Sequence, residues 1–467
     1  MRSWARRTAA LHDELVALAD FHGGDPRWWL VAGGAALAWA PRAAYLASDA
    51  EPAADTFLGW RDPPPADAAR DAVARALAAR AAIRALDGTL PDQPLAVTIR
   101  RTAAGAAAVA SALDVAAFAV GDRTWCAPLA DPDAIAADLA SVLADEPPRV
   151  LRPLAAAGAT PFVSVTLGDE PLESARHGHR RAWRANGESV GPWLGLSRAG
   201  GLAVVSTCHM VVDGYGHALL ASKIAASLRT AIELELRGDQ GPRTEDRGAP
   251  NVRSSSSVVP CSLLPSQFAL PLAWRELASP LRALPLAYAT GLFLHRLADR
   301  RDSPRSPTFQ IPVAPGAAGD PARRARRVVP ALASVHFEAG VPEPFARFAE
   351  RARAAIAREA DGSGLVTRLM AAARAAPTPL AWKRRAIGAT RPRWLAPVAD
   401  VLGGRACVSR IRIDEPLPAT CAVSSPAAPD GLVVTAVDDG AHAALTLCGA
   451  GATPALLDEL LALVPSD

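Results

Sequence analysis

The segment 207–216 contains residues whose types and spacing could carry out proton transfer. His209 ends an apolar run, Asp213 follows four positions later, and Gly214 comes directly after the aspartate. An imidazole with a pKa of about 6.5 is a natural general base at neutral pH. No nucleophile at a fixed position accompanies the pair, so we expect Asp213 to bond backbone amides or an arginine and so hold the turn. Gly214 allows a backbone conformation that other residues avoid.

Two other interpretations of these residues stay open. A histidine at a strand end is often a hydrogen-bonded core residue, and Asp-Gly is a common turn pair. A metal site with His209 and Asp213 at positions i and i+4 would need a helix, yet the valines on both sides favour a strand and no third ligand is present. We therefore expect no metal here.

The elements that must position His209 can be predicted from its surroundings. Residues 193–197 and 202–207 flank Ala199-Gly200-Gly201, which predicts a β-hairpin that leads into the histidine. Leucine or isoleucine then recurs every four residues from 220 to 236, which predicts a helix with one apolar stripe. His209 is thus expected between a buried strand and a packed helix.

Strands and helices are mixed along the whole chain, which indicates an α/β fold. In the first half we predict helices over 68–86 and 131–143 and strands over 94–100 and 161–167. In the second half we predict helical segments over 266–300, a helix over 342–358, strands over 331–337, 408–413, 432–437 and 443–448, and a final helix over 453–463.

The length of 467 residues exceeds what one hydrophobic core usually holds, so two domains are expected. The segment 237–260 is polar and rich in glycine, proline and serine, and it lacks periodicity, which is typical of a linker. We predict an N-terminal lobe over 1–237 that carries His209, a linker or crossover loop over 238–260, and a C-terminal lobe over 261–467.

Composition and charge exclude several classes of function. Half of the residues are hydrophobic and 21% are charged, which is typical of a globular protein. The net charge of +3 and the absence of aromatics among the short basic patches argue against nucleic-acid binding. Six cysteines without a Cys-x-x-Cys pair argue against a zinc ribbon or a disulfide scaffold and favour a reducing cytoplasm.

We expect no secretory signal and no integral membrane span. No apolar segment follows the basic residues at the N-terminus. The uncharged stretch 28–41 is shorter than the about twenty residues that a membrane helix needs. We predict a cytoplasmic protein, and peripheral contact of this stretch with a membrane is the alternative.

The segment 207–216 and its striped helix resemble the active-site segment of the CoA-dependent acyltransferase superfamily, with its motif H-x-x-x-D-G. This superfamily includes chloramphenicol acetyltransferase, condensation domains and wax ester synthase/diacylglycerol acyltransferases. The motif also stands in the first lobe of a chain of about the expected length. The resemblance implies an α/β fold with two chloramphenicol-acetyltransferase-like α–β sandwich lobes and an interlobe tunnel.

The same resemblance implies a mechanism. His209 would deprotonate a hydroxyl or amine of a small-molecule or lipid acceptor, which attacks an acyl thioester on CoA or on the pantetheine arm of a carrier protein. The acyl thioester is a cosubstrate, and no tightly bound cofactor is implied. Asp213 would be structural and Gly214 would allow the turn. The developing oxyanion needs a donor; Ser409 is the candidate by position, and an ordinary strand serine is the alternative.

The chain departs from the family pattern at two places. Cys208 stands where several groups carry the first of two histidines, and Arg410 follows Ser409 where wax synthases carry asparagine. A catalytically inactive relative that binds a partner or a carrier is therefore the alternative function.

Three further histidines stand at two places in the sequence, a cluster at 177–179 and His217 just past the motif. His177-Gly178-His179, followed by two arginines, is predicted to be a solvated loop, with contact to a carrier phosphate as the alternative. His217 is predicted on the surface of the helix or near the tunnel.

Overall fold

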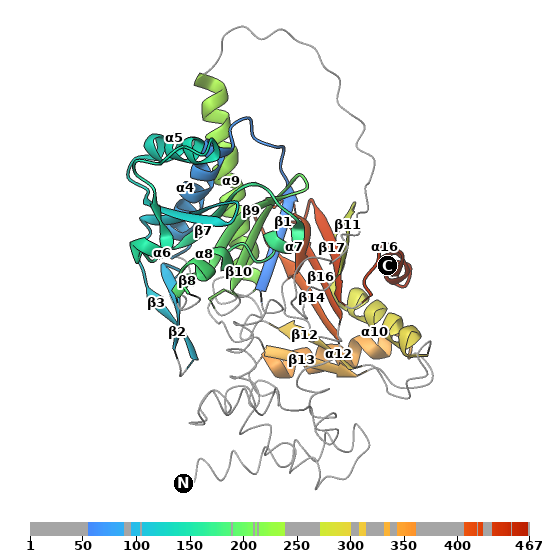
Figure 1. Ribbon diagram of the computed structural model, residues 1–467. Coiled ribbons are helices and arrows are strands. Elements are labelled where there is room, and N and C mark those ends of the chain that lie inside the picture. Colours follow the sequence, from blue (N-terminus) through green and yellow to red (C-terminus); the bar gives the residue numbers. More distant parts are fainter. Residues whose placement is uncertain are drawn as a thin grey trace, which may run out of the picture.

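The computed structural model describes residues 55–87, 95–102, 105–187, 190–208, 211–212, 214–238, 271–299, 308–313, 331–336, 343–360, 406–417, 419–423, 432–449 and 451–465. The fold is α/β, as the sequence predicted, and its main feature is two large sheets covered by helices (Figure 1).

The first sheet has eight strands in the order β15-β1-β10-β9-β7-β4-β5-β6. Their bounds are β1 (Asp55–Arg61), β4 (Val115–Val120), β5 (Arg123–Pro128), β6 (Arg152–Pro153), β7 (Val163–Asp169), β9 (Leu194–Ala199), β10 (Leu202–Cys208) and β15 (Ala419–Val423). The predicted hairpin is confirmed as β9 and β10. Gly200 and Gly201 form its turn with φ of +56° and +81°, where glycine is favoured.

Three short strands form a separate sheet in the order β3-β2-β8. Their bounds are β2 (Val97–Thr102), β3 (Gly105–Ala110) and β8 (Val190–Pro192).

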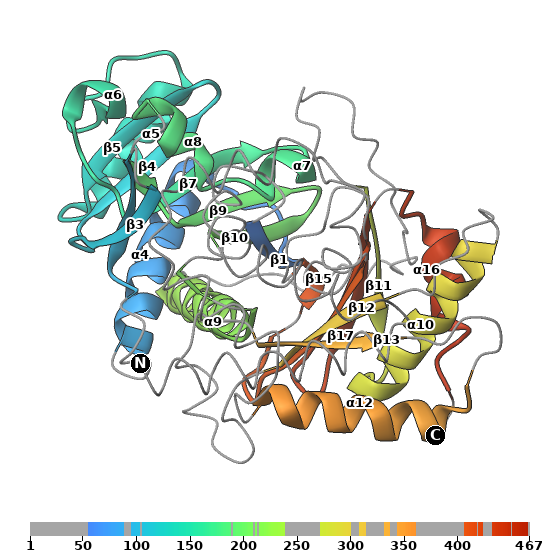
Figure 2. The same ribbon diagram turned by 90° about the horizontal axis from the view of Figure 1, so that it is seen from below.

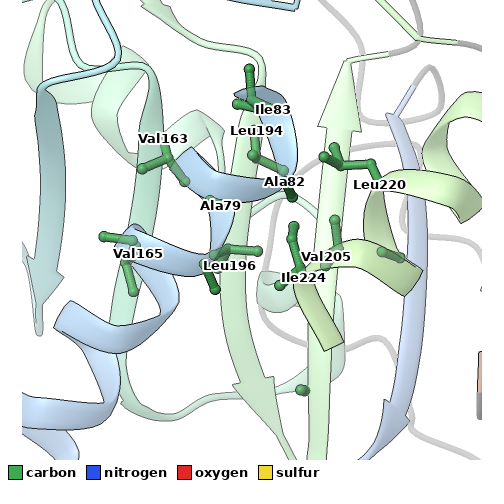
Figure 3. Close-up of a cluster of buried hydrophobic side chains, with 14 of the residues drawn as sticks. Ala79, Ala82, Ile83, Val163, Val165, Leu194, Leu196, Val205, Leu220 and Ile224 are labelled. Carbon is green, nitrogen blue, oxygen red and sulfur yellow. The ribbon is translucent and has the colours of Figure 1, made fainter. Parts of the chain in front are cut away.

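Helices cover the first sheet on both sides. The bounds are α4 (Ala68–Asp87), α5 (Pro132–Leu143), α6 (Leu154–Ala157), α7 (Leu172–Ala175), α8 (Arg180–Ala185) and α9 (Gly214–Gly238). Figures 1 and 2 show α4 and α9 on one side and α7 and α8 on the other. Figure 3 shows Ile83 of α4 and Leu220 and Ile224 of α9 among valines and leucines of the central strands, and these three side chains are fully buried. Each such burial stabilises the fold by about 1.5–3 kcal/mol.

The second sheet has six strands in the order β11-β17-β16-β14-β12-β13. Their bounds are β11 (Leu272–Leu277), β12 (Thr308–Val313), β13 (Ala331–His336), β14 (Ala406–Arg412), β16 (Leu432–Asp438) and β17 (Ala443–Gly449). The helices α10 (Ala283–Asp299), α12 (Phe345–Ala360) and α16 (Pro454–Leu461) lie on the side of this sheet that faces away from the first sheet (Figure 2).

One stretch of the predicted helical region is a strand. Leu272–Leu277 pairs antiparallel with β17, with Leu272 opposite Cys448, while the helix α10 follows as predicted. The sequence LAWREL consists mostly of good helix formers, yet pairing with the edge of β17 decides its conformation. Tertiary context overrides local propensity here.

The two sheets share buried residues. Ile411 and Val437 of the second sheet belong to the same core as the α9 stripe, and Cys407 and Val433 pack in a cluster with Val204 of β10. The strand β15 comes from the second half of the chain and pairs with β1 of the first sheet, while it also contacts β16 and β17. The lobe boundaries and the tunnel stay predictions, since residues 239–270 lie outside the described part.

The predicted starts of two helices are confirmed in atomic detail. Asp131 caps α5 by accepting a hydrogen bond from the Ala134 amide at 3.0 Å, and Thr453 caps α16 by accepting one from the Leu456 amide at 3.2 Å. Such side chains satisfy backbone donors that the first helical turn leaves without partners.

None of the described helices is long and apolar enough to cross a bilayer. The uncharged stretch 28–41 lies outside the described residues.

The carboxylate of Asp138 organises the loop after α5. Its Oδ2 accepts hydrogen bonds from the amides of Arg149, Val150 and Leu151 at 2.7, 2.5 and 2.9 Å. Burial raises the pKa of this carboxyl, but the three amides outweigh that effect and hold the pKa below its usual range. We expect Asp138→Ala to lower the free energy of unfolding by about 2–3 kcal/mol at pH 7.

The pH dependence of this loss has a defined sign. Because the pKa is depressed in the folded state, the stabilisation is present above the unfolded pKa of about 4 and is lost as pH falls through the folded value. Urea unfolding should therefore separate wild type and Asp138→Ala more widely at pH 7 than at pH 3. Asp133→Ala in the exposed first turn of the same helix is the control, and an equal separation at both pH values would contradict the assignment.

Candidate functional site

The structure describes both flanks of the predicted site, while His209 and Asp213 themselves lie outside the described residues. Cys208 ends β10 and Gly214 begins α9, so the predicted order of strand, motif and helix is confirmed. The Cys208 amide donates to the Trp193 carbonyl at 2.8 Å, and the Val211 amide donates to the Cys208 carbonyl at 3.1 Å. Both sides of His209 are therefore held by backbone hydrogen bonds.

Thr207 links the strand end to the helix through a chain of buried polar groups. Its Oγ1 lies 2.8 Å from Nδ1 of His217 and 2.5 Å from Oγ1 of Thr56, which is its pairing partner on β1. Both threonines are fully buried and His217 is 2% exposed. The prediction that His217 lies on the helix surface or near a tunnel is therefore wrong about the surface, because the first turn of α9 packs against the sheet.

Ser206 makes the corresponding contact on the opposite face of β10. Consecutive residues of a strand point to opposite faces. The Ser206 Oγ lies 3.3 Å from both the backbone amide and the Nδ1 of His179. Both residues are almost fully buried, so the prediction of a solvated loop is wrong for His179, while contact of this cluster with a carrier phosphate stays a prediction.

Two glycines explain why the segment with His179 lies so close to the sheet. A Cβ on Gly195 of β9 would overlap the backbone amide of His179, and a Cβ on Gly178 would lie 2.5 Å from Oγ of Ser197. The sequence carried a signal for this contact, because glycine inside a strand often marks the close approach of another backbone.

Ser409 faces the first sheet. It is 5% exposed, pairs with Thr435 of β16, and shares its face of β14 with Cys407 and Ile411, which pack in the cores common to both sheets. Helix α9 contacts β14 as well. The candidate serine is thus on the side of the second sheet that the motif helix approaches.

Arg410 lies on the other face of β14. Its Nη2 is 2.9 Å from Oδ2 of Asp438, an almost fully buried carboxylate. The charge of Arg410 is therefore paired on the face of β14 opposite to Ser409.

An ion pair and hydrogen bonds connect the loop before β15 to α9. Lys223 Nζ lies 2.6 Å from Oε1 of Glu415, and the Ser222 hydroxyl donates to Oε2 of Glu415 at 3.3 Å and to the Pro416 carbonyl at 3.0 Å. These contacts hold the segment between β14 and β15 against the helix that follows the motif.

The described cysteines are buried thiols. Cys208 is 1% exposed in the hydrophobic core, and burial raises the pKa of Cys421 to about 12 and also raises that of Cys126. A thiol that stays protonated is a poor nucleophile and a poor metal ligand. Within the described ranges, no group of three or more His, Cys, Asp or Glu side chains could hold a metal ion.

Comparison with known proteins gives structural similarity without close sequence relatives. No family model and no curated protein matches the chain. The starter condensation domain of rhizomide synthetase is 13% identical, with 91% of this chain and 96% of that chain covered and a TM-score of 0.40. Polyketide synthase associated protein 5 from Mycobacterium tuberculosis is 14% identical, with 88% and 92% covered and a TM-score of 0.43. The first condensation domain of CDA synthetase is 16% identical, with 90% and 93% covered and a TM-score of 0.37.

Proposed function

We propose that this chain is an acyltransferase that moves an acyl group from a CoA or carrier-protein thioester to a hydroxyl or amine acceptor, with His209 as general base. The observation that carries the proposal is the anchoring of the motif H-x-x-x-D-G at the junction of a fully buried strand and a packed helix. Asp213 and Gly214 would shape the turn, and the donor would be a cosubstrate that leaves as a free thiol. We place the reaction in the cytoplasm.

The proposed chemistry needs one base and one oxyanion donor. His209 takes the proton of the acceptor as its oxygen or nitrogen attacks the thioester carbonyl. The tetrahedral intermediate carries a negative charge on the former carbonyl oxygen. Its collapse breaks the carbon–sulfur bond, and the departing thiolate takes the proton from the imidazolium. The described cysteines are consistent with a route that forms no acyl-enzyme, because they are buried as thiols.

Thiol release tests this proposal directly. The full chain would be incubated with acyl-CoA thioesters and with acyl thioesters on a carrier protein, each with a panel of alcohols and amines. We expect thiol release that requires the acceptor and equals the amount of acylated acceptor measured by mass spectrometry. If no donor releases thiol above the level of His209→Ala while an acyl carrier still binds, the chain is a non-catalytic binding protein instead.

Ser409 is the proposed oxyanion donor, because its hydroxyl lies on the face of β14 turned toward the first sheet. Removing one such donor typically lowers kcat by about 10²–10³-fold. We therefore expect Ser409→Ala to lower kcat by this amount and to leave KM nearly unchanged, since the charge develops only after substrate binding.

Thr435→Val is the matched control for the serine variant. Thr435 is the pairing partner of Ser409, it is fully buried, and its Oγ1 has no hydrogen-bond partner within the described part of the chain. Removing that hydroxyl should leave kcat unchanged and stabilise the fold by about 1 kcal/mol. An unchanged kcat in both variants would mean that Ser409 is an ordinary strand serine.

A further inference from the structure

A series of hydrogen-bonded side chains, Thr56–Thr207–His217, connects three elements beside the motif. Thr56 lies on β1, Thr207 is the penultimate residue of β10, and His217 stands in the first turn of α9. The polar atoms are 2.5 and 2.8 Å apart, and all three side chains are buried. These contacts therefore join the end of β10 to the start of α9, which are the two elements that residues 209–213 connect.

The position of these hydrogen bonds next to the motif restrains α9 relative to the end of β10. Thr207 is two residues before His209, and His217 is three residues after Gly214. A hydrogen bond between them limits the sliding of α9 along the strand end, and buried hydrogen bonds resist such motion because an unpaired polar group inside a protein is costly. Apolar packing of the α9 stripe alone is non-directional and would tolerate small shifts.

We propose that His217 is a positioning residue, which acts through Thr207 to fix the first turn of α9 on the end of β10 and thereby the segment that carries His209. This inference rests on the proposed role of His209 as the base. The atom that acts is Nδ1 of His217, because it makes the contact with Thr207. His217 itself would not exchange protons with substrate.

Two pairs of variants separate this role from others. His217→Leu and Thr207→Val remove the polar contact, while His217→Asn and Thr207→Ser keep a hydrogen-bonding atom near the position of Nδ1 or Oγ1. The asparagine side chain has no atom that corresponds to Nε2, so it cannot replace a histidine that works as an acid or base through that nitrogen. Ser206→Ala is the control, because Ser206 is equally buried in the same strand but faces His179 instead.

Hydrogen exchange measured by mass spectrometry on peptides that cover residues 205–215 reports the positioning without any activity assay. We expect exchange about tenfold faster in His217→Leu and Thr207→Val, and near wild-type exchange in His217→Asn, Thr207→Ser and Ser206→Ala. In the thioester assay, kcat should fall about ten- to hundredfold in the first two variants at constant KM, because small displacements of a catalytic group are costly. The other three variants should keep kcat.

The outcomes distinguish the two proposals. Unchanged hydrogen exchange in both His217→Leu and Thr207→Val overturns the positioning role. A kcat of His217→Asn as low as that of His217→Leu overturns it as well. Thr207→Val preserves the shape of the side chain, so it provides the test if His217→Leu fails to fold. If the variants show the expected exchange pattern but the wild-type protein turns over no thioester, the positioning of the motif is supported and the proposed function is overturned.

Discussion

Replacing His209 with alanine is expected to lower kcat by about 10²–10⁴-fold, the range that a positioned general base contributes. The acceptor hydroxyl or amine would then attack without losing its proton to the protein. KM should change little, because in the proposed mechanism the imidazole would act on the acceptor proton only as the transition state forms. Acceptor-dependent thiol release under saturating donor measures the effect.

The matched control removes an imidazole from outside the motif. His442 lies on the turn between β16 and β17, where its side chain is 66% exposed and its Nδ1 is 3.5 Å from Asp439. His442→Ala should keep wild-type kcat. If His209→Ala retains turnover within about threefold of wild type, a general-base contribution of the usual size is ruled out.

Elements with strong local signals were predictable from the sequence. The hairpin before the motif follows from two glycines at its turn, and these two residues have positive φ. The helix after the motif follows from the four-residue stripe, of which Leu220 and Ile224 are fully buried. Asp131 and Thr453 marked helix starts through their capping side chains. Each of these signals lies within a few residues of the feature that it predicts.

Features that depend on distant contacts could not be predicted in the same way. The pairing of β15 with β1 joins residues more than 350 positions apart, and Leu272–Leu277 becomes a strand only because β17 offers an edge. His179 and His217 are buried by contacts with Ser206 and Thr207, which are polar residues of a strand that otherwise reads as apolar. Gly195 signals that another backbone approaches the sheet, but no residue around either histidine identifies Ser206 or Thr207 as its partner.

The largest expected loss of stability comes from adding one methyl group to Gly195. An ideal Cβ at this position of β9 would overlap the backbone amide of His179 and would lie 2.7 Å from the Gly178 carbonyl carbon and from Oγ of Ser206. Backbone atoms cannot swing aside as the end of a flexible side chain can. Gly195→Ala must therefore push the segment around His179 away from the sheet or distort the hairpin. We expect a loss of about 3 kcal/mol or more in the free energy of unfolding, measured by urea unfolding.

Gly59→Ala on β1 is the matched control for this loss. Both glycines are buried in strands of the first sheet, and neither has a positive φ, so backbone strain does not distinguish them. A Cβ on Gly59 would meet the side-chain sulfur of Cys421 at 3.1 Å, and a shift of that single side-chain atom by a few tenths of an ångström would relieve the contact. This variant should stay within about 1 kcal/mol of wild type. Equal losses at the two positions would mean that the backbone of His179 is not packed on β9. The contact between His179 and Ser206, which depends on that packing, would then be excluded as well.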